Sequence, residues 1–186
     1  MKRFELQPTP LSGLVLVQRQ RLGDARGFLS RLFCTDELAA AGWTRPVRQI
    51  NHTHTARRGC VRGLHFQHAP HAEAKLVSCL RGAVFDVAVD LRAGSPTFLR
   101  WHASTLTADN GCALLIPEGF AHGFQTLTDD VEMLYCHSAP HVAAAEGGIH
   151  PLDEQLAIDW PLPVSEMSPR DAAHARLATE FEGVSS

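Results

Sequence analysis

Short runs in which apolar and polar residues alternate dominate the middle of the chain. In the clearest run, residues 84–91, apolar side chains occupy the odd positions from 85 to 91, while Asp86 and Asp90 share the other face. A period of two is typical of a half-buried strand. Turn-forming triplets separate the runs at hairpin spacing, at 94–96, 109–111 and 128–130. Short strands at such intervals favour a small antiparallel barrel or jelly roll.

The two aspartates of that run change what the interior of the barrel must be like. A carboxylate that faces a dry core loses its hydration without compensation. Asp86 and Asp90 therefore predict a polar pocket inside the barrel.

The flanking segments have different patterns. Residues 14–17 form a short apolar strand candidate, and residues 23–27 are predicted to be a loop because they combine Gly and Asp. A helix is expected over 36–41, with Thr35 as its N-cap and Gly42 ending it. The tail over 168–181 is Ala-rich and predicted to be helical.

Composition narrows the class of protein. With 186 residues, 45% of them hydrophobic, the chain can bury one sizeable core. Its formal charge of −3 indicates neither a nucleic-acid partner nor a membrane surface, although local basic residues can still hold an anionic ligand. Neither a signal-peptide core nor a run of membrane length is evident. Five cysteines without a C-x2-C pair indicate reduced thiols, so a soluble, cytoplasmic protein is expected.

Two histidines stand out from the eleven in the chain because each lies in a framed motif. Residues 59–67 and 111–122 match the two half-motifs of the cupin barrels, G-x5-H-x-H and G-x5-P-x-G-x2-H, and contain His65 and His122. Gln67 stands where a metal-binding cupin has its second histidine, and the usual glutamate a few residues on is also missing. The sequence therefore predicts chemistry without a metal. The other histidines are expected to be solvated or simply hydrogen-bonded.

A longer series of motifs resembles the dTDP-4-dehydrorhamnose 3,5-epimerase family over about residues 8–175. The matching segments are Arg62-Gly63-Leu64-His65-Phe66-Gln67, Lys75-Leu76-Val77, 82–90, 94–98, 116–124 and Ile158-Asp159-Trp160-Pro161. The resemblance implies an all-β cupin jelly-roll barrel with short flanking helices that forms a homodimer through its N-terminal strands. A single domain is expected, with N-terminal strands and helix over about 1–46, a core over about 47–140 and a C-terminal tail over about 165–186.

The family's reaction suits the residue types that match. In a nucleotide 4-keto-6-deoxyhexose, the protons on C3 and C5 lie alpha to the C4 ketone. Inverting either carbon needs a base on one face, an acid on the other and a cation near O4, with no cofactor. The resemblance makes His65 the base, Asp171 its orienting carboxylate, Tyr135 the proton donor and Lys75 the cation near the enolate.

The same resemblance implies a set of substrate-binding residues for the nucleotide sugar. Arginines suit a diphosphate because the planar guanidinium donates in a fork. The set comprises Arg26, Phe28, Arg31, Gln49, Asn51, Arg62, Lys75, His122, His141, Glu146 and Arg170.

Several positions depart from the family pattern. Arg31 replaces a glutamate, Cys136 replaces the lysine after the tyrosine, and Pro151 replaces a tryptophan. Pro140 and His141 stand where a tyrosine pair is usual, so a histidine replaces the aromatic ring that stacks on thymine. These departures predict an altered nucleotide or sugar preference, or altered selectivity between C3 and C5.

Other functions remain as alternatives. A metal-dependent cupin oxygenase would use His52, His54, His65 and His122, although Gln67 counts against a complete set of ligands. A ketoisomerase that moves the carbonyl between C4 and C3 would also proceed through an enolate. A catalytically silent sugar-binding cupin is disfavoured because the four catalytic positions are all retained.

Overall fold

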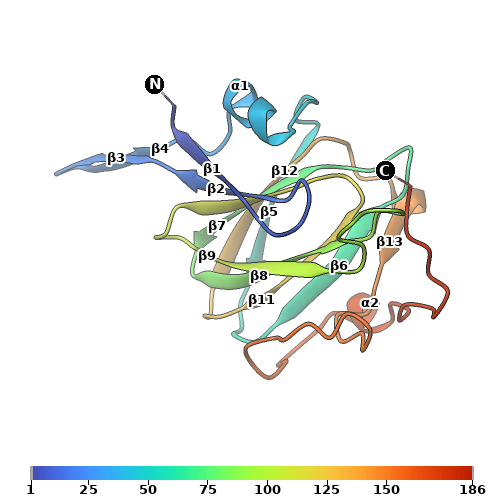
Figure 1. The fold of residues 1–186 in the computed structure, drawn as a ribbon. Coiled ribbons are helices and arrows are strands. Elements are labelled where there is room, and N and C mark those ends of the chain that lie inside the picture. Colours follow the sequence, from blue (N-terminus) through green and yellow to red (C-terminus); the bar gives the residue numbers. More distant parts are fainter. Residues whose placement is uncertain (1, 186) are drawn as a thin grey trace.

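Two antiparallel sheets make up most of the structure (Figure 1), a computed structural model that describes residues 2–185. In spatial order, the six-stranded sheet consists of β1 (Phe4–Pro8), β2 (Val15–Arg19), β10 (Cys112–Ile116), β7 (Lys75–Arg81), β12 (Val131–His137) and β5 (Gln49–Thr55). The five-stranded sheet consists of β13 (Glu146–Gly148), β6 (Val61–Gln67), β11 (Phe120–Thr126), β8 (Ala83–Asp90) and β9 (Trp101–Thr107).

The main core lies between the two sheets. Val77 and Met133 from the six-stranded sheet pack with Ala88, Leu106 and Phe124 from the five-stranded sheet, and all five are fully or almost fully buried. Non-sequential strand neighbours and two facing sheets are the features of a jelly roll. The all-β jelly-roll prediction is therefore confirmed.

The alternation predicted for β8 is confirmed and separates two environments. Val87 and Val89 point away from the main core into a cluster that the C-terminal part of the chain covers through residues such as Leu177. Asp86 lies on the inner face and is fully buried. Since both faces of this sheet are covered, the C-terminal segment is part of the folded unit and can bring residues to the site.

Four sequence-based boundaries needed correction at the N-terminal end. The strand predicted over 14–17 is β2, which begins at Val15 and runs to Arg19. The predicted loop over 23–27 is part of a hairpin of β3 (Arg21–Asp24) and β4 (Gly27–Ser30). Helix α1 covers only Thr35–Leu38 and has Cys34 as its N-cap, with a 3₁₀ turn η1 (Ala39–Ala41) after it. Gly42 ends the helix as predicted, in the left-handed conformation with φ of 96°.

The C-terminal tail is not the long helix that its alanine content suggested. Helix α2 covers only Pro169–Ala172, and the other short helical element, η2, covers Ala143–Ala145. Leu177 instead joins the outer apolar cluster, and its N–H donates to Asp153 Oδ2 at 2.7 Å. Burial along the sheet therefore outweighs helix propensity in this segment. Within residues 2–185, we find no helix with the length and apolar character that crossing a membrane requires.

A pair of glycines brings β6 and β11 unusually close together. A Cβ on Gly63, where φ is 129°, would lie 2.6 Å from the Cα of Gly123. A side chain at this point would force the strands apart. Because Gly63 and Gly123 lack side chains, β6 and β11 stay close together beside His65 and His122.

Candidate active site

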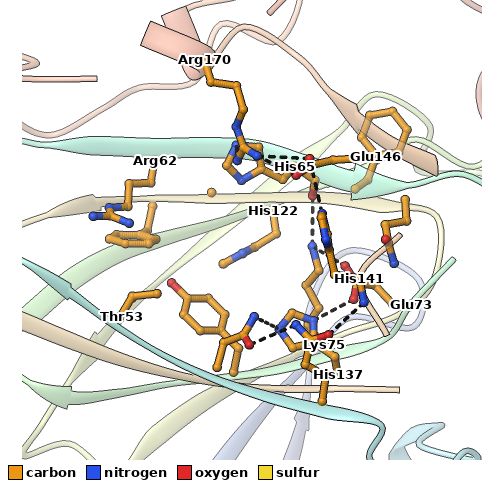
Figure 2. A pocket seen from close by; sticks show the side chains of 17 residues that line it. Thr53, Arg62, His65, Glu73, Lys75, His122, His137, His141, Glu146 and Arg170 are labelled. Carbon is orange, nitrogen blue, oxygen red and sulfur yellow. Dashed lines mark hydrogen bonds and ion pairs between the residues drawn. The ribbon is translucent and has the colours of Figure 1, made fainter. Parts of the chain in front are cut away.

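A pocket of about 270 Å³ lies between the two sheets (Figure 2). Ten of the fourteen residues predicted for the site line this pocket, namely His65, Lys75, Tyr135, Gln49, Asn51, Arg62, His122, His141, Glu146 and Arg170. They come from strands of both sheets and from the C-terminal segment, so the fold assembles residues that are far apart in the sequence.

His65 and Asp171 form a close pair at one side of the pocket. His65 Nε2 lies 2.8 Å from Asp171 Oδ1, and the backbone N–H of Gly63 donates to Oδ2 at 3.2 Å. The carboxylate is buried whereas a quarter of the His65 side chain is exposed. Burial alone would raise the pKa of the Asp171 carboxyl, but the hydrogen bond and charge of His65 outweigh it and lower the pKa. Asp171 is thus an ionised partner that holds the imidazole in place.

The short helix α2 explains how Asp171 reaches its position. Ser168 caps the helix by accepting a hydrogen bond from the Asp171 N–H at 3.0 Å, and Pro169 occupies the first turn, where its missing N–H costs nothing. The segment Ser168-Pro169-Arg170-Asp171 therefore makes a rigid turn that presents the carboxylate to β6.

Arg170 lies at the rim of the same pair. Its guanidinium contacts Glu146 at 3.0 Å and also lies 3.1 Å from His65 Nε2. Since Nε2 can donate its proton to Asp171 or accept from Arg170, but not both, the stronger contact with the carboxylate sets the tautomer. Arg170 is more than half exposed and is available to an anionic ligand.

Tyr135 comes from the opposite sheet. It lies on β12, in the six-stranded sheet, and stands next to two pocket histidines, His122 and His137, with ring centroids 6.0 and 6.1 Å away. Burial raises the pKa of its hydroxyl well above the usual value, so the group stays protonated at neutral pH. A permanent proton donor on one sheet therefore shares the pocket with His65 on the other.

Lys75 belongs to an ionic group that the sequence analysis missed. Its Nζ lies 3.2 Å from Glu73 Oε1 and donates to the backbone carbonyl of His65 at 3.2 Å. Glu73 Oε2 also lies 2.7 Å from His137 Nδ1, and all three side chains are almost buried. Burial would raise the pKa of Glu73, but the contacts with His137 and Lys75 lower it below its usual value.

A strand-period argument could have found both missed residues. Glu73 lies two positions before Lys75, and His137 lies two positions after Tyr135, so each shares a face with a residue already assigned to the site. The general expectation that His137 is simply hydrogen-bonded is too narrow, because the residue lines the pocket.

His122 meets the inward-facing aspartate of β8. Its Nε2 lies 2.9 Å from Asp86 Oδ1, and both side chains are buried. This pairing confirms that Asp86 indicates a polar interior. Asp90 does not reach the pocket: Arg92 and Ser95 hold its carboxylate in the loop after β8.

Amide side chains line another part of the pocket. Gln49 Nε2 donates to Asn51 Oδ1 at 3.0 Å, and Gln49 Oε1 accepts from the backbone N–H of His141 at 2.9 Å. The half-exposed ring of His141 lies 3.5 Å from Glu146. A nucleotide base bound here would contact an imidazole and amide groups.

Three predicted binding residues lie outside the pocket in this chain. Arg26 and Phe28 are on the β3–β4 hairpin, where Arg26 pairs with Asp24 at 2.5 Å. Arg31 follows the hairpin and pairs with Glu37 at 2.5 Å. Phe28 is 60% exposed, and Figure 1 shows the hairpin projecting from the body of the molecule. These residues can touch a ligand only outside their own chain's pocket.

The four histidines that a metal-dependent oxygenase would need do not converge. His52 and His54 lie on the outer face of β5, are at least half exposed and pair with Glu132 and Asp130. Of these four histidines, only His65 and His122 face the pocket. The alternation along β5 therefore rules out this set as a common ligand shell.

Comparison with known proteins identifies the family of this chain. The sequence profile described as dTDP-4-dehydrorhamnose 3,5-epimerase matches residues 8–179. A dTDP-4-dehydrorhamnose 3-epimerase from Streptomyces niveus is 40% identical over 94% of this chain and 84% of its own. A dTDP-4-dehydrorhamnose 3,5-epimerase from Sinorhizobium fredii is 38% identical over 92% and 88%.

The solved structures include a dTDP-6-deoxy-D-glucose-3,5-epimerase from Legionella pneumophila in complex with dTDP-4-keto-L-rhamnose. It has 37% sequence identity and a TM-score of 0.90, with 98% of this chain and 99% of that chain covered. The chain belongs to the dTDP-4-dehydrorhamnose 3,5-epimerase family.

Proposed function

We propose that the protein epimerises a nucleotide-linked 4-keto-6-deoxyhexose at C3, C5 or both. One observation supports this most directly: His65 and Tyr135 line the same pocket from opposite sheets. Inversion of a carbon needs proton removal on one face and proton delivery on the other, and a base and an acid on facing walls meet that need.

The steps follow from the chemistry of the side chains. His65 removes the proton alpha to the C4 ketone, and Asp171 holds the imidazole and stabilises its protonated form. The ammonium of Lys75 stabilises the enolate oxygen as negative charge develops. Tyr135, which burial keeps protonated, then donates to the carbon from the other side. No electron leaves the substrate, so the reaction balances without a redox partner.

A dTDP sugar is the proposed substrate. The support is the family and the Legionella relative, which is in complex with dTDP-4-keto-L-rhamnose. In this chain, Arg62 and Arg170 at the pocket supply guanidinium groups for a diphosphate. His141 and Gln49 stand at the end where we place the nucleotide base.

A homodimer completes the proposal. The projecting β3–β4 hairpin exposes Phe28 and Leu29, at 60% and 67%, and large apolar side chains in this position suit a protein interface. We place the hairpin of one subunit against the pocket of the other, where Arg26 and Arg31 would reach the nucleotide. Light scattering should give about twice the 20.3 kDa chain mass.

We also place the protein in the cytoplasm, because its free thiols fit a reducing compartment.

Incubation with dTDP-4-keto-6-deoxyglucose in deuterium oxide tests the reaction. Deuterium incorporation at C3, C5 or both, read by NMR and mass spectrometry, would identify the inverted centres. A carbonyl found at C3 after the reaction would indicate a ketoisomerase instead. Failure to exchange any alpha proton would refute an enolate mechanism.

A further inference from the structure

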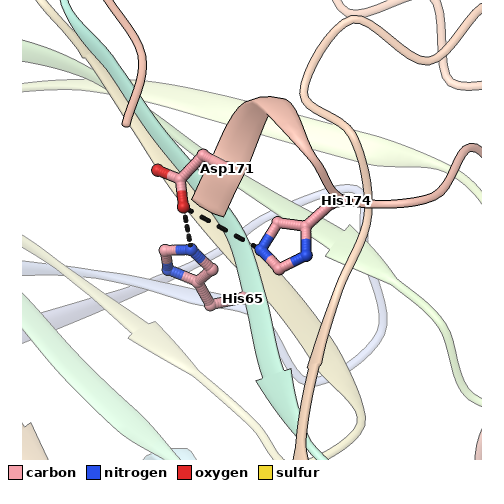
Figure 3. Close-up of side chains that lie close together, drawn as sticks. All are labelled: His65, Asp171 and His174. Carbon is pink, nitrogen blue, oxygen red and sulfur yellow. Dashed lines mark hydrogen bonds and ion pairs between the residues drawn. The ribbon is translucent and has the colours of Figure 1, made fainter. Parts of the chain in front are cut away.

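His174 places a third ligating group beside the His65–Asp171 pair, and the proposed reaction does not use it. Its Nε2 atom is buried and has no hydrogen-bond partner. The nearest acceptor is Asp171 Oδ1 at 3.9 Å, the same oxygen that lies 2.8 Å from His65 Nε2. Figure 3 shows the two imidazoles on different sides of that carboxylate, both directed toward it.

The ring of His174 is held in this position. Asp171 and His174 are three residues apart at the end of α2, so the turn of the helix directs both toward β6. A Cβ on Gly148 would lie 2.2 Å from Cε1 of His174, which means that the ring fills space that only a glycine leaves free. It also contacts His65 edge to face, with centroids 5.6 Å apart.

Two imidazole nitrogens and one carboxylate oxygen, all within 4.8 Å of one another, form a ligand set of the kind that binds Zn²⁺. Zinc bonds of about 2.0–2.2 Å put neighbouring ligands of a tetrahedral shell roughly 3.4 Å apart. The contacts of 2.8 and 3.9 Å lie on either side of that value, so small side-chain shifts suffice. We propose that His65, Asp171 and His174 form an inhibitory site for a divalent cation of the Zn²⁺ type.

A second hollow gives the cation a route to this group. About 400 Å³ of space lies against His65 and Asp171, with the exposed carboxylate of Glu166 among its lining residues. This hollow adjoins the pocket between the sheets, because His65 and Arg170 line both. Arg170 opposes binding because its guanidinium lies 3.1 Å from His65 Nε2. Its side chain is more than half exposed and pairs with Glu146, so it can move away from the site. Repulsion between the Arg170 guanidinium and the cation weakens binding, so we expect the cation to bind reversibly and not to be a permanent part of the fold.

The consequence for turnover rests on the proposed role of His65 as the base. A metal on Nε2 takes the place of the proton shared with Asp171 and occupies the carboxylate. The imidazole then has a cation in place of an anion beside it, which lowers its affinity for a proton from the substrate. Bound Zn²⁺ therefore inhibits, and a chelator restores activity.

The site is tested by metal binding in the absence of substrate, so its outcome is independent of the proposed reaction. Chelator-treated protein is titrated with Zn²⁺ in a calorimeter, and Co²⁺ is used in parallel because its visible spectrum reports the coordination. The wild type, His174→Ala and His174→Asn are compared with His71→Ala, which changes an exposed histidine elsewhere. Deuterium wash-in is then measured with and without Zn²⁺.

We expect one Zn²⁺ per chain in the wild type and in His71→Ala, and binding at least tenfold weaker in both His174 variants. Inhibition, expressed relative to each variant's own metal-free rate, should weaken in parallel. Wild-type binding that persists unchanged in both His174 variants would overturn the site. So would wild-type protein that takes up no Zn²⁺. If Zn²⁺ binds through His174 without slowing proton exchange, the site stands as a metal site but not as an inhibitory one.

Discussion

His65 and His122 lie directly opposite each other in the pairing of β6 with β11, and each imidazole contacts the carboxylate of a different segment. Their surroundings separate their roles. About a quarter of the His65 side chain is exposed, whereas His122 and its partner Asp86 are buried. A base must reach its substrate, so the exposed side of its ring favours His65 for catalysis, whereas the buried His122 suits binding.

Removing either member of the pair of His65 and Asp171 should stop turnover. We expect His65→Ala and Asp171→Asn to lower the rates of epimerisation and proton exchange by roughly 10²–10⁴-fold, the usual scale of general base catalysis. Stopped-flow or NMR assays in deuterium oxide measure both rates, and circular dichroism confirms that the variants fold. Near wild-type exchange in His65→Ala would mean that another group is the base.

The sequence could predict those parts of the site that lie in contiguous motifs. His65 and Lys75 stand in segments that match family motifs, the same resemblance assigns Tyr135, and all three line the pocket. Period-two alternation, as in β8 with Asp86 and its apolar neighbours on opposite faces, predicts a small β-barrel, whereas the cupin jelly roll is what the family resemblance implies. Both results depend on local patterns that survive in a single sequence.

The remaining features depend on which distant residues pair, and no local pattern encodes that. Glu73 and His137 are 64 residues apart, and their pairing exists only because β7 and β12 are neighbours. His174 is expected from the sequence to be solvated or simply hydrogen-bonded, but the absence of a side chain at Gly148 leaves room for its partly buried ring beside Asp171. The tail failed as a long helix because Leu177 gains more from burial than from helical structure.

Tyr135→Phe should separate two steps that His65→Ala affects together. Loss of the hydroxyl removes the proton donor and leaves the base intact, so net epimerisation should slow more than proton exchange. The two rates are read from one experiment in deuterium oxide, as product formed and deuterium incorporated. Equal slowing of both would instead assign the hydroxyl to substrate binding.

Glu73→Gln should make Lys75, which we place at the enolate, less effective at stabilising the enolate oxygen. The change removes the carboxylate that neutralises Lys75 and orients its ammonium, so we expect kcat/KM to fall about 10–100-fold, mostly through kcat. Glu73→Asp should recover part of the loss, and the exposed Glu180→Gln serves as the control. A change confined to KM would contradict a role at the enolate.

Glu73 should also contribute to the unfolding free energy in a pH-dependent way. Because the pKa of Glu73 is lowered in the fold, its carboxylate is charged above its ordinary value of 4.5 and its contribution disappears only as the pH falls through the lower folded value. The difference in unfolding free energy between the wild type and Glu73→Gln should therefore stay constant over the neutral range and shrink under acid conditions.

Asp90 should contribute to acid stability without affecting catalysis. Burial would raise the pKa of its carboxyl, but hydrogen bonds from Arg92, Ser95 and Thr97 lower it from 3.8 to about 2. The contribution is present above pH 3.8 and is lost as the pH falls through about 2. Asp90→Asn should cost about 2 kcal/mol of unfolding free energy at neutral pH. Urea titrations from pH 7 to pH 2 measure it, with the exposed Asp109→Asn as the control. A pH-independent difference would contradict the ionic origin.

His141 should set how tightly the protein binds the nucleotide base. Its ring is half exposed where we place the nucleotide base, and it offers a smaller stacking face than tyrosine. Base–aromatic stacking contributes about 1–3 kcal/mol per base, so replacing imidazole with phenol should recover part of it. We expect His141→Tyr to tighten dTDP binding by up to about tenfold, which corresponds to about 1.4 kcal/mol. Calorimetric titration with dTDP, UDP, CDP and GDP, using His71→Tyr as the matched control, gives the comparison. Because stacking acts on the base alone, the affinities for all four nucleotides should rise while their diphosphate contacts stay constant. If His141→Ala leaves the affinities for all four nucleotides unchanged, the histidine does not contact the base, and any preference for dTDP arises elsewhere.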